Sequence, residues 1–193
     1  IADAVHAFGG EVVMTSGLHS TGTDRLAEVA QKLNLHDQTI VVNVQGDEPL
    51  LPPRAIAQVS SLLANEPRAA MATLCEPIVT EADRQNPNQV KVVFDQNGRA
   101  LYFSRAALPA GFPDQSPPLT YRHIGLYAYR AGFLRRFHGW RPTALEQAER
   151  LEQLRALEHG EWIQMAVTEC EIPPGVDTLA DLERVRLHLQ GGR

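Results

Sequence analysis

Two aspartates, Asp47 and Asp177, have the residue type and the setting for metal chemistry. Asp47 follows the apolar run 40–44, and Asp177 lies in a turn after a second strand-like run, 162–168. Because the carboxyl ends of parallel strands gather at one edge of a sheet, we expect the two carboxylates to lie near each other. Such a pair suits Mg²⁺, which usually takes one or two carboxylates beside substrate phosphate oxygens. The alternatives are an ordinary turn at Asp47 and, at Asp177, a charge that only stabilises the following helix.

A second group of polar side chains could hold an acidic, hydroxyl-rich ligand. His123 and Tyr127 are four residues apart in the alternating run 121–130, so they point to the same face of a strand. Arg105 follows another strand-like run and could bind a carboxylate with two parallel hydrogen bonds. Gln45 shares a strand face with Asp47 if the extended geometry continues that far. The alternative is that His123 and Tyr127 are ordinary core residues.

The loop 15–22 is rich in hydroxyl groups and glycine and leads into a helix that Thr23 and Asp24 open. Backbone N–H groups at a helix N-terminus favour an anion or a polar ring edge. An ordinary turn followed by a helix cap would produce the same composition.

The elements that position these residues alternate between strand and helix, which predicts an α/β fold. The run 40–44 is β-branched and apolar, so we expect a strand buried on both faces of a mostly parallel sheet. Asn97 and Gly98 predict a hairpin between two runs at 90–94 and 100–103. This hairpin and the long strand 121–130 indicate a smaller antiparallel lobe. The remaining strands are predicted at 11–14, 69–74 and 162–168, and the helices at 1–8, 23–33, 52–63, 131–137, 143–159 and 178–189.

Two sets of apolar positions define the expected buried faces of the longer early helices. For the first helix the set is Leu26, Val29, Ala30 and Leu33; for the second it is Ile56, Val59 and Leu63.

Composition excludes several classes of protein. The chain has 193 residues, of which 44% are hydrophobic, and this is enough for one domain with a sizeable core. A net charge of -5 disfavours nucleic acid as a partner, because nucleic-acid footprints are usually basic. No apolar run approaches the roughly 20 residues that span a bilayer. Cys75 and Cys170 fit no metal-binding spacing, so we expect a reduced, cytoplasmic protein.

Seven ordered motifs resemble the 3-deoxy-manno-octulosonate cytidylyltransferase family, also called CMP-Kdo synthetases. They occupy residues 22–28, 43–49, 87–91, 101–105, 123–127, 151–155 and 175–178. The resemblance extends from Ile1 to about Arg186. It implies a Rossmann-like nucleotidyltransferase fold, with residues 1–193 forming a single domain and about 100–140 forming the smaller lobe, which would mediate dimerisation. It also implies a cytoplasmic, Mg²⁺-dependent homodimer that serves lipopolysaccharide biosynthesis and requires neither nucleic acid nor a membrane.

The resemblance further implies a reaction and a role for each matching residue. CTP and Kdo would give CMP-Kdo and pyrophosphate, with the anomeric hydroxyl of Kdo attacking the α-phosphorus in line. Asp47 and Asp177 would be the catalytic residues and would hold Mg²⁺. The residues around the sugar would be Gln45, Arg105, His123, Tyr127, Glu152 and Gln153. Those near the cytidine would be Ser20, Gly22 and Thr23.

Two departures from the family pattern affect this expectation. The family begins with a strand and a basic loop that grips the triphosphate, and these would precede Ile1. We therefore expect the first strand and the phosphate loop to be missing, and the 193-residue polypeptide to be inactive or very weak by itself. The loop 109–120 is short and lacks an aromatic–acidic–arginine turn common in relatives, which affects a possible lid and part of the dimer edge.

Two other readings stay open. One is the same chemistry on another acidic sugar, such as sialic acid, and a panel of sugars would distinguish the two. The other is a non-catalytic remnant that dimerises or binds sugar. The nucleotide sequence upstream of Ile1 would separate this remnant from an enzyme.

Overall fold

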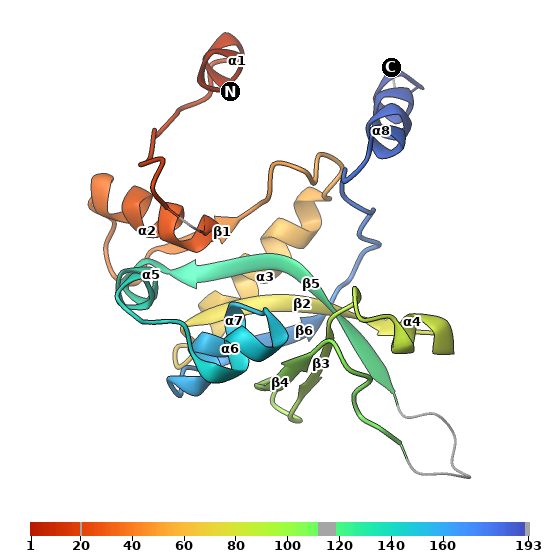
Figure 1. Cartoon of the computed structure of the whole chain (residues 1–193). Helices are drawn as coiled ribbons and strands as arrows, with labels where there is room; N and C mark the ends of the chain where they lie inside the picture. The colour runs from red at the N-terminus through yellow and green to blue at the C-terminus, as the bar shows by residue number, and fades with distance from the viewer. Residues whose placement is uncertain (20, 112–118, 192–193) are drawn as a thin grey trace. The chain divides into compact units, whose positions relative to one another are not determined.

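Six strands form one mixed sheet in the computed structural model, which describes residues 1–19, 21–111 and 119–191 (Figure 1). The strands are β1 (Ile40–Asn43), β2 (Met71–Ile78), β3 (Lys91–Phe94), β4 (Ala100–Ser104), β5 (Thr120–Arg130) and β6 (Ile163–Val167). Their order is β4-β3-β5-β2-β6, and β1 also pairs with β5. The chain divides into two units, Ile1–Thr39 with Arg130–Arg141 and Ile40–Tyr129 with Pro142–Arg193, and each is described by itself.

The strand directions differ from the mostly parallel sheet that the sequence predicts. β2 and β6 run parallel. β5 runs antiparallel to both β2 and β3, and β3 runs antiparallel to β4. The physical reason is the position of β5. It lies in the middle of the sheet and runs opposite to both of its neighbours, β2 and β3, so the pairing on each of its sides is antiparallel. The segment expected to be a smaller lobe thus contributes β4 and β5 to this one sheet, and its part in dimerisation stays a prediction.

The core of the larger unit lies between the sheet and helix α3 (Pro53–Asn65). Ala55, Val59 and Leu63 are its buried positions, so Val59 and Leu63 are confirmed, whereas Ala55 takes the inward place expected for Ile56. β1 packs Ile40 and Val42 against this core, yet all its residues are only half-buried. The expectation that β1 is buried on both faces is therefore wrong, and one face alone contributes to the core.

Two short helices replace the single helix expected over 143–159. They are α6 (Ala144–Glu149) and α7 (Gln153–Glu158), and Figure 1 shows them in front of the sheet, with α3 behind it. A capping contact lies at the start of α6, where the Thr143 N–H donates to Glu146 Oε2 at 3.0 Å. Arg150 then adopts a left-handed conformation with φ 54°, which ends α6. This break turns Leu151 and Gln153 inward, to 6% and 8% exposed.

The β3–β4 hairpin is confirmed, and Gly98 has the positive φ of 77° that its turn requires. A Cβ at Gly98 would lie 2.6 Å from Gln164 Nε2, so the turn also needs the small residue for close packing. The unit further contains α4 (Glu81–Gln85) and α8 (Leu179–Gly191). Within the described ranges, no helix has the length and apolar character to cross a membrane.

The smaller unit contains α1 (Ala2–Ala7), α2 (Gly22–Lys32) and α5 (Ala131–His138), and α2 packs against α5 (Figure 1). The buried face of α2 consists of small residues, Thr23, Ala27 and Ala30. Of the apolar face expected on α2, Ala30 is buried, Leu26 and Val29 are half-buried, and Leu33 is 53% exposed. Short side chains on α2 accommodate the bulky buried Phe133 and Phe137 of α5.

The strand expected at 11–14 is absent from this unit, whose described residues contain no strand beyond the end of β5. Met14 is 69% exposed, and its carbonyl accepts from Lys32 Nζ at 2.7 Å instead of from a neighbouring strand. A short run without a pairing partner cannot satisfy its backbone groups as a strand. Of the loop 109–120, residues 112–118 lie outside the described part, so the expectation of a lid there stays a prediction.

Candidate functional site

The turns that carry Asp47 and Asp177 are joined by a direct backbone hydrogen bond. The N–H of Val176 donates to the Asp47 carbonyl at 2.8 Å. Gly175 lies equally close, because a Cβ there would stand 3.2 Å from the same carbonyl. The sequence prediction that these two turns meet is therefore confirmed. Both aspartate side chains are exposed.

The two carboxylates are free to bind a ligand. Among the described residues, neither carboxylate accepts a hydrogen bond or forms an ion pair. The alternative for Asp177, a charge that only stabilises the following helix, stays open. The hydrogen-bonding cap of that helix is provided by Asp181. Its Oδ2 accepts from the Thr178 N–H at 2.9 Å and from the Thr178 hydroxyl at 2.8 Å. Hydrogen bonds from Thr178 and Arg184 hold the pKa of Asp181 below its usual value.

Glu48 is a half-buried third carboxyl beside this pair. Burial raises its pKa, and the neighbouring negative charge of Asp47 adds to the effect, whereas Arg122 opposes it. Arg122 itself is paired with Glu76, whose Oε1 lies 2.6 Å from Nη2. The turn thus concentrates negative charge, which a divalent cation would offset.

A row of aromatic side chains lies on one face of β5 and continues onto β4. The ring centroids of Phe103 and His123 are 5.1 Å apart, those of His123 and Tyr127 are 5.2 Å apart, and those of Tyr127 and Tyr129 are 5.5 Å apart. The prediction that His123 and Tyr127 share a face is confirmed. We call these four residues the aromatic row.

A bulge in β5 shapes this row. The register between β2 and β5 shifts between Thr73 and Leu74, which face Tyr127 and Ile124 respectively. Bulges of this kind re-aim the side chains around them and often lie near functional sites. Gln45 also approaches the bulge, since a Cβ on Gly125 would lie 3.5 Å from its Nε2. The structure therefore brings Gln45 to the strand that carries His123 and Tyr127.

His123 is held as a neutral ring. Its Nε2 lies 3.0 Å from the hydroxyl of Thr73, a residue that is itself fully buried. Burial lowers the pKa of His123 to about 3, and the nearby positive charge of Arg122 lowers it further. Burial raises the pKa of Tyr127 well above its ordinary value, with the charges of Tyr129 and Glu152 adding to it. At neutral pH both rings can therefore exchange hydrogen bonds with hydroxyl groups without carrying charge.

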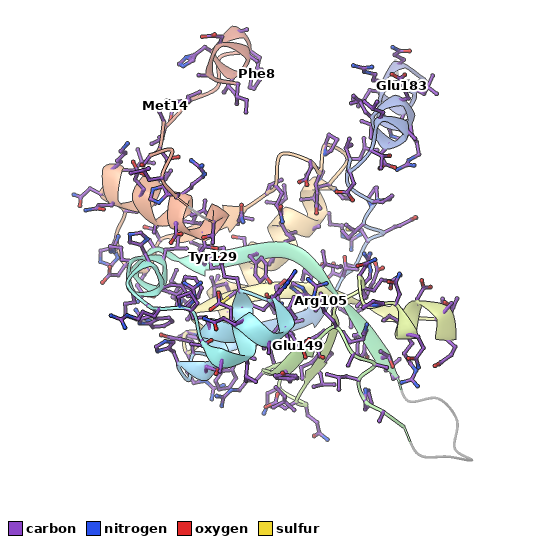
Figure 2. All side chains as sticks on the ribbon, viewed as in Figure 1. Phe8, Met14, Arg105, Tyr129, Glu149 and Glu183 are labelled. Atoms are coloured by element: carbon purple, nitrogen blue, oxygen red, sulfur yellow. The ribbon has the colours of Figure 1, made fainter. Side chains whose placement is uncertain are left out.

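Arg105 is fixed by contacts on both its backbone and its side chain. Its Nε donates to the Glu149 carbonyl at 2.9 Å, and its Nη1 donates to the Pro87 carbonyl at 3.1 Å. Its backbone N–H donates to Glu149 Oε2 at 3.0 Å. Figure 2 labels Arg105 and Glu149, which come from the end of β4 and the end of α6. These bonds use only part of the five-donor guanidinium, so it can still bind a carboxylate.

Glu152 and Gln153 begin α7, directly after the break at Arg150. Glu152 lies close enough to Tyr127 for its charge to affect the pKa of that phenol. Their placement on a single continuous helix was wrong, yet the break is what brings this pair inward. The six predicted sugar-side residues thus all belong to the larger unit. Gln45, His123, Tyr127 and Glu152 lie around β5, Arg105 is held by Glu149 at the end of α6, and Gln153 lies at the start of α7.

The residues predicted to lie near a nucleotide base belong to the smaller unit. Gly22 begins α2, and Thr23 is 7% exposed. The cap of α2 is Thr21, whose hydroxyl accepts from the Asp24 N–H at 3.2 Å, and not Thr23 as the sequence suggests. Ser20 lies outside the described residues. The role of all three residues stays a prediction.

Sequence reasoning missed three supporting residues. Glu149 holds Arg105 and also accepts from the Ser104 hydroxyl at 2.6 Å. Thr73 holds His123, and Lys91 is buried beside Arg105. The lone lysine in the apolar run 90–94 was a signal for Lys91, because an unpaired charge is rarely placed among buried strand residues. Nothing local marks Thr73 or Glu149, whose partners are 50 and 45 residues away.

The donor set around Asp47 fits a weakly held hard cation. In residues 1–19, 21–111 and 119–191, no three His, Cys, Asp or Glu side chains form a cluster that could hold a metal. Two oxygen donors are typical of Mg²⁺, which keeps water and takes substrate phosphates as its other ligands.

Comparisons with known proteins identify the family of the chain. A family model described as Cytidylyltransferase matches residues 1–163. The chain is 54% identical over 197 residues to 3-deoxy-manno-octulosonate cytidylyltransferase 2 of Actinobacillus pleuropneumoniae, covering 98% of this chain and 78% of that protein. It is 56% identical over 200 residues to 3-deoxy-manno-octulosonate cytidylyltransferase of Pseudomonas syringae, covering 99% and 78%.

Solved structures show the same relationship. A CMP:2-keto-3-deoxy-manno-octonic acid synthetase complexed with CTP superposes with a TM-score of 0.89 at 39% identity, covering 99% of this chain and 77% of the other. A 4-diphosphocytidyl-2C-methyl-D-erythritol synthase matches with a TM-score of 0.60 at 16% identity, which shows a shared fold alone.

Proposed function

Because the chain belongs to the cytidylyltransferase family, we propose that it transfers the cytidylyl group of CTP to the anomeric hydroxyl of Kdo. The products are CMP-Kdo and pyrophosphate. The observation that carries this proposal is the backbone hydrogen bond from Val176 to Asp47, which joins the two turns that carry the Asp47 and Asp177 carboxylates. The larger unit also supplies groups suited to an acidic sugar. This combination supports a reaction between a phosphate donor and such a sugar.

Asp47 and Asp177 would hold Mg²⁺ in this proposal. The ion, when bound, neutralises the negative charge of the phosphates. Asp181 caps α8 by accepting from the Thr178 N–H, and the Asp177 carboxylate takes no part in that hydrogen bond.

The sugar-side residues bind and orient Kdo. The guanidinium of Arg105 binds the sugar carboxylate through its remaining donors. Neutral His123 and protonated Tyr127 exchange hydrogen bonds with sugar hydroxyls, and Gln45, Glu152 and Gln153 add polar contacts. The anomeric hydroxyl then loses its proton to water as its oxygen bonds to the α-phosphorus and the bond from that phosphorus to the bridging oxygen of pyrophosphate breaks. Positioning and charge stabilisation suffice for this displacement, so no covalent enzyme intermediate is needed.

The proposal extends to the setting of the reaction. We propose a cytoplasmic homodimer, with residues about 100–140 at the subunit interface, that supplies activated Kdo for lipopolysaccharide biosynthesis. These points follow from the resemblance of the motifs to the family.

Pyrophosphate release tests the substrate assignment. The complete product of the gene is incubated with CTP and Mg²⁺ and either Kdo, sialic acid or no sugar. We expect release with Kdo alone. Equal or faster release with sialic acid would contradict the assignment of Kdo as the substrate. No release with any acidic sugar would contradict the proposed transfer.

A further inference from the structure

Lys91 is a fully buried cation at the centre of the sugar-side strands. It is 0% exposed, and its Nζ donates to three backbone carbonyls: Asn86 at 2.8 Å, Gln89 at 2.6 Å and Arg105 at 2.7 Å. An ammonium group has three N–H donors, so these three bonds satisfy it completely. Lys91 therefore has no donor left for a substrate and no exposed surface from which to contact one.

The three carbonyls connect the backbone of Arg105 with the turn that its side chain uses. Arg105 Nη1 donates to the carbonyl of Pro87, which lies in that turn between Asn86 and Gln89. Lys91 thus holds both ends of this contact: the main chain from which the guanidinium extends and the turn that aims it.

The position of Lys91 in the sheet adds a second connection. β3 pairs with β4 and β5, and Lys91 lies opposite Ser104 on one side and Arg122 on the other. The next residues along these neighbouring strands are Arg105 and His123. The N–H of His123 also donates to the carbonyl of Val90 at 2.8 Å. Lys91 consequently lies between the two strands that carry the predicted carboxylate and hydroxyl contacts.

The choice of lysine at this position is unusual for this chain. Of its 18 basic residues only Lys32 and Lys91 are lysines, and the rest are arginines. A compact ammonium can direct three N–H groups from one atom to three carbonyls, whereas the planar fork of arginine cannot. Burial lowers the pKa of Lys91, and the charge of Arg105 lowers it further, while Glu149 opposes both. Burying a charge costs free energy. A buried lysine here therefore indicates that the three carbonyl contacts require the geometry of an ammonium group.

We propose that Lys91 is a positioning residue that orients Arg105 for the carboxylate of the acidic sugar. It acts through Arg105 and contacts neither substrate nor nucleotide. This inference rests on the proposed function, because it assumes that Arg105 binds the sugar carboxylate.

The test measures KM and kcat for both substrates in the Lys91→Met variant of the complete gene product. Methionine retains the length and the packing but removes the three donors. We expect KM for Kdo to rise about tenfold or more, the scale of one misplaced charge-assisted contact, with kcat and KM for CTP within about twofold. The matched control is Lys32→Met, the same change at the only other lysine, which is exposed on α2 and should leave all constants unchanged.

A double-variant cycle with Arg105→Gln separates positioning from a merely structural role. If Lys91 acts through Arg105, Lys91→Met causes no further rise in KM for Kdo once Arg105 is replaced. Additive effects, or a KM for Kdo within twofold of the unsubstituted enzyme in folded Lys91→Met, would overturn the inference. If Lys91→Met does not fold, Lys91→Arg keeps the charge, and it should still raise KM for Kdo because it cannot serve all three carbonyls. An unsubstituted protein that releases no pyrophosphate from CTP and Kdo would instead refute the proposed function.

Discussion

The charge state of His123 decides what this residue can do for a ligand. Its pKa of about 3 leaves the ring neutral over the physiological range, and the cause is burial beside Arg122. An imidazolium would attract the sugar carboxylate, but a neutral ring selects hydroxyl groups by hydrogen bonding. In the proposed function, carboxylate recognition is consequently assigned to Arg105, and hydroxyl recognition to His123 and Tyr127.

This protonation state predicts a pH dependence of stability. In the unfolded chain the pKa of a histidine is about 6.5, so the unfolded state binds more protons between that pH and 3. The contribution of His123 is fully present above about pH 6.5 and is lost as the pH falls toward 3, with a slope of at most about 1.4 kcal/mol per pH unit. Urea unfolding from pH 7 to 4 measures it. His123→Asn should have a shallower dependence than the unsubstituted chain, and an identical slope would show that His123 contributes nothing.

Asp177 and Asp181 are only four residues apart but have different roles. Asp181→Ala removes the acceptor of the Thr178 N–H, so we expect a lower thermal midpoint from fraying of α8. Turnover at a temperature where the variant is folded should be unchanged. Circular dichroism and pyrophosphate release measure the two effects, and a large loss of turnover would place Asp181 in the site.

At the scale of elements, the break between α6 and α7 is the feature that positions the predicted sugar-side residues Glu152 and Gln153. The left-handed Arg150 ends α6 and brings Glu152 and Gln153 to the start of α7. A side chain in this conformation costs about 1–2 kcal/mol, whereas glycine adopts it freely.

Arg150→Gly should accordingly raise the free energy of unfolding by about 1 kcal/mol without changing KM for Kdo. Arg150→Ala is the matched control, because it removes the same side chain but retains the strain, and it should give no gain. Denaturant unfolding compares the variants. Destabilisation by glycine would mean that the arginine side chain, and not the backbone, maintains the break.

Sequence reasoning succeeds for several elements and fails at the break between α6 and α7. The hairpin at Gly98, the helices 53–65 and 131–138 and the meeting of the Asp47 and Asp177 turns were predictable, because local turn chemistry or strand-end geometry determines them. The break at Arg150 was not, since 144–158 is continuously helical in composition. At the break, Arg155 Nε donates to Glu146 Oε2 and Leu151 is buried, and both contacts depend on tertiary packing that the sequence does not display.

At the scale of the whole molecule, the long strand β5 pairs with β1, β2 and β3. The sheet is mixed because β5 runs antiparallel to β2 and β3, whereas β2 and β6 run parallel. A single sequence does not reveal which strands become neighbours, so the run 40–44 predicted a fully buried parallel strand and proved half-buried. The supporting roles of Thr73 and Glu149 were hidden for the same reason, because their partners are 50 and 45 residues away. The residues expected to contact substrates were predicted from their types and motifs, whereas the contacts that hold them in place required the structure.

The central claim is that Asp47 and Asp177 form a Mg²⁺ site for cytidylyl transfer to Kdo. The most direct test compares Mg²⁺-dependent pyrophosphate release by the unsubstituted complete gene product and its Asp177→Asn variant, with circular dichroism to confirm folding. We predict a loss of at least about 100-fold in kcat with the fold retained, the scale for removing a group that stabilises charge in the transition state. An unchanged rate in Asp177→Asn would contradict the account.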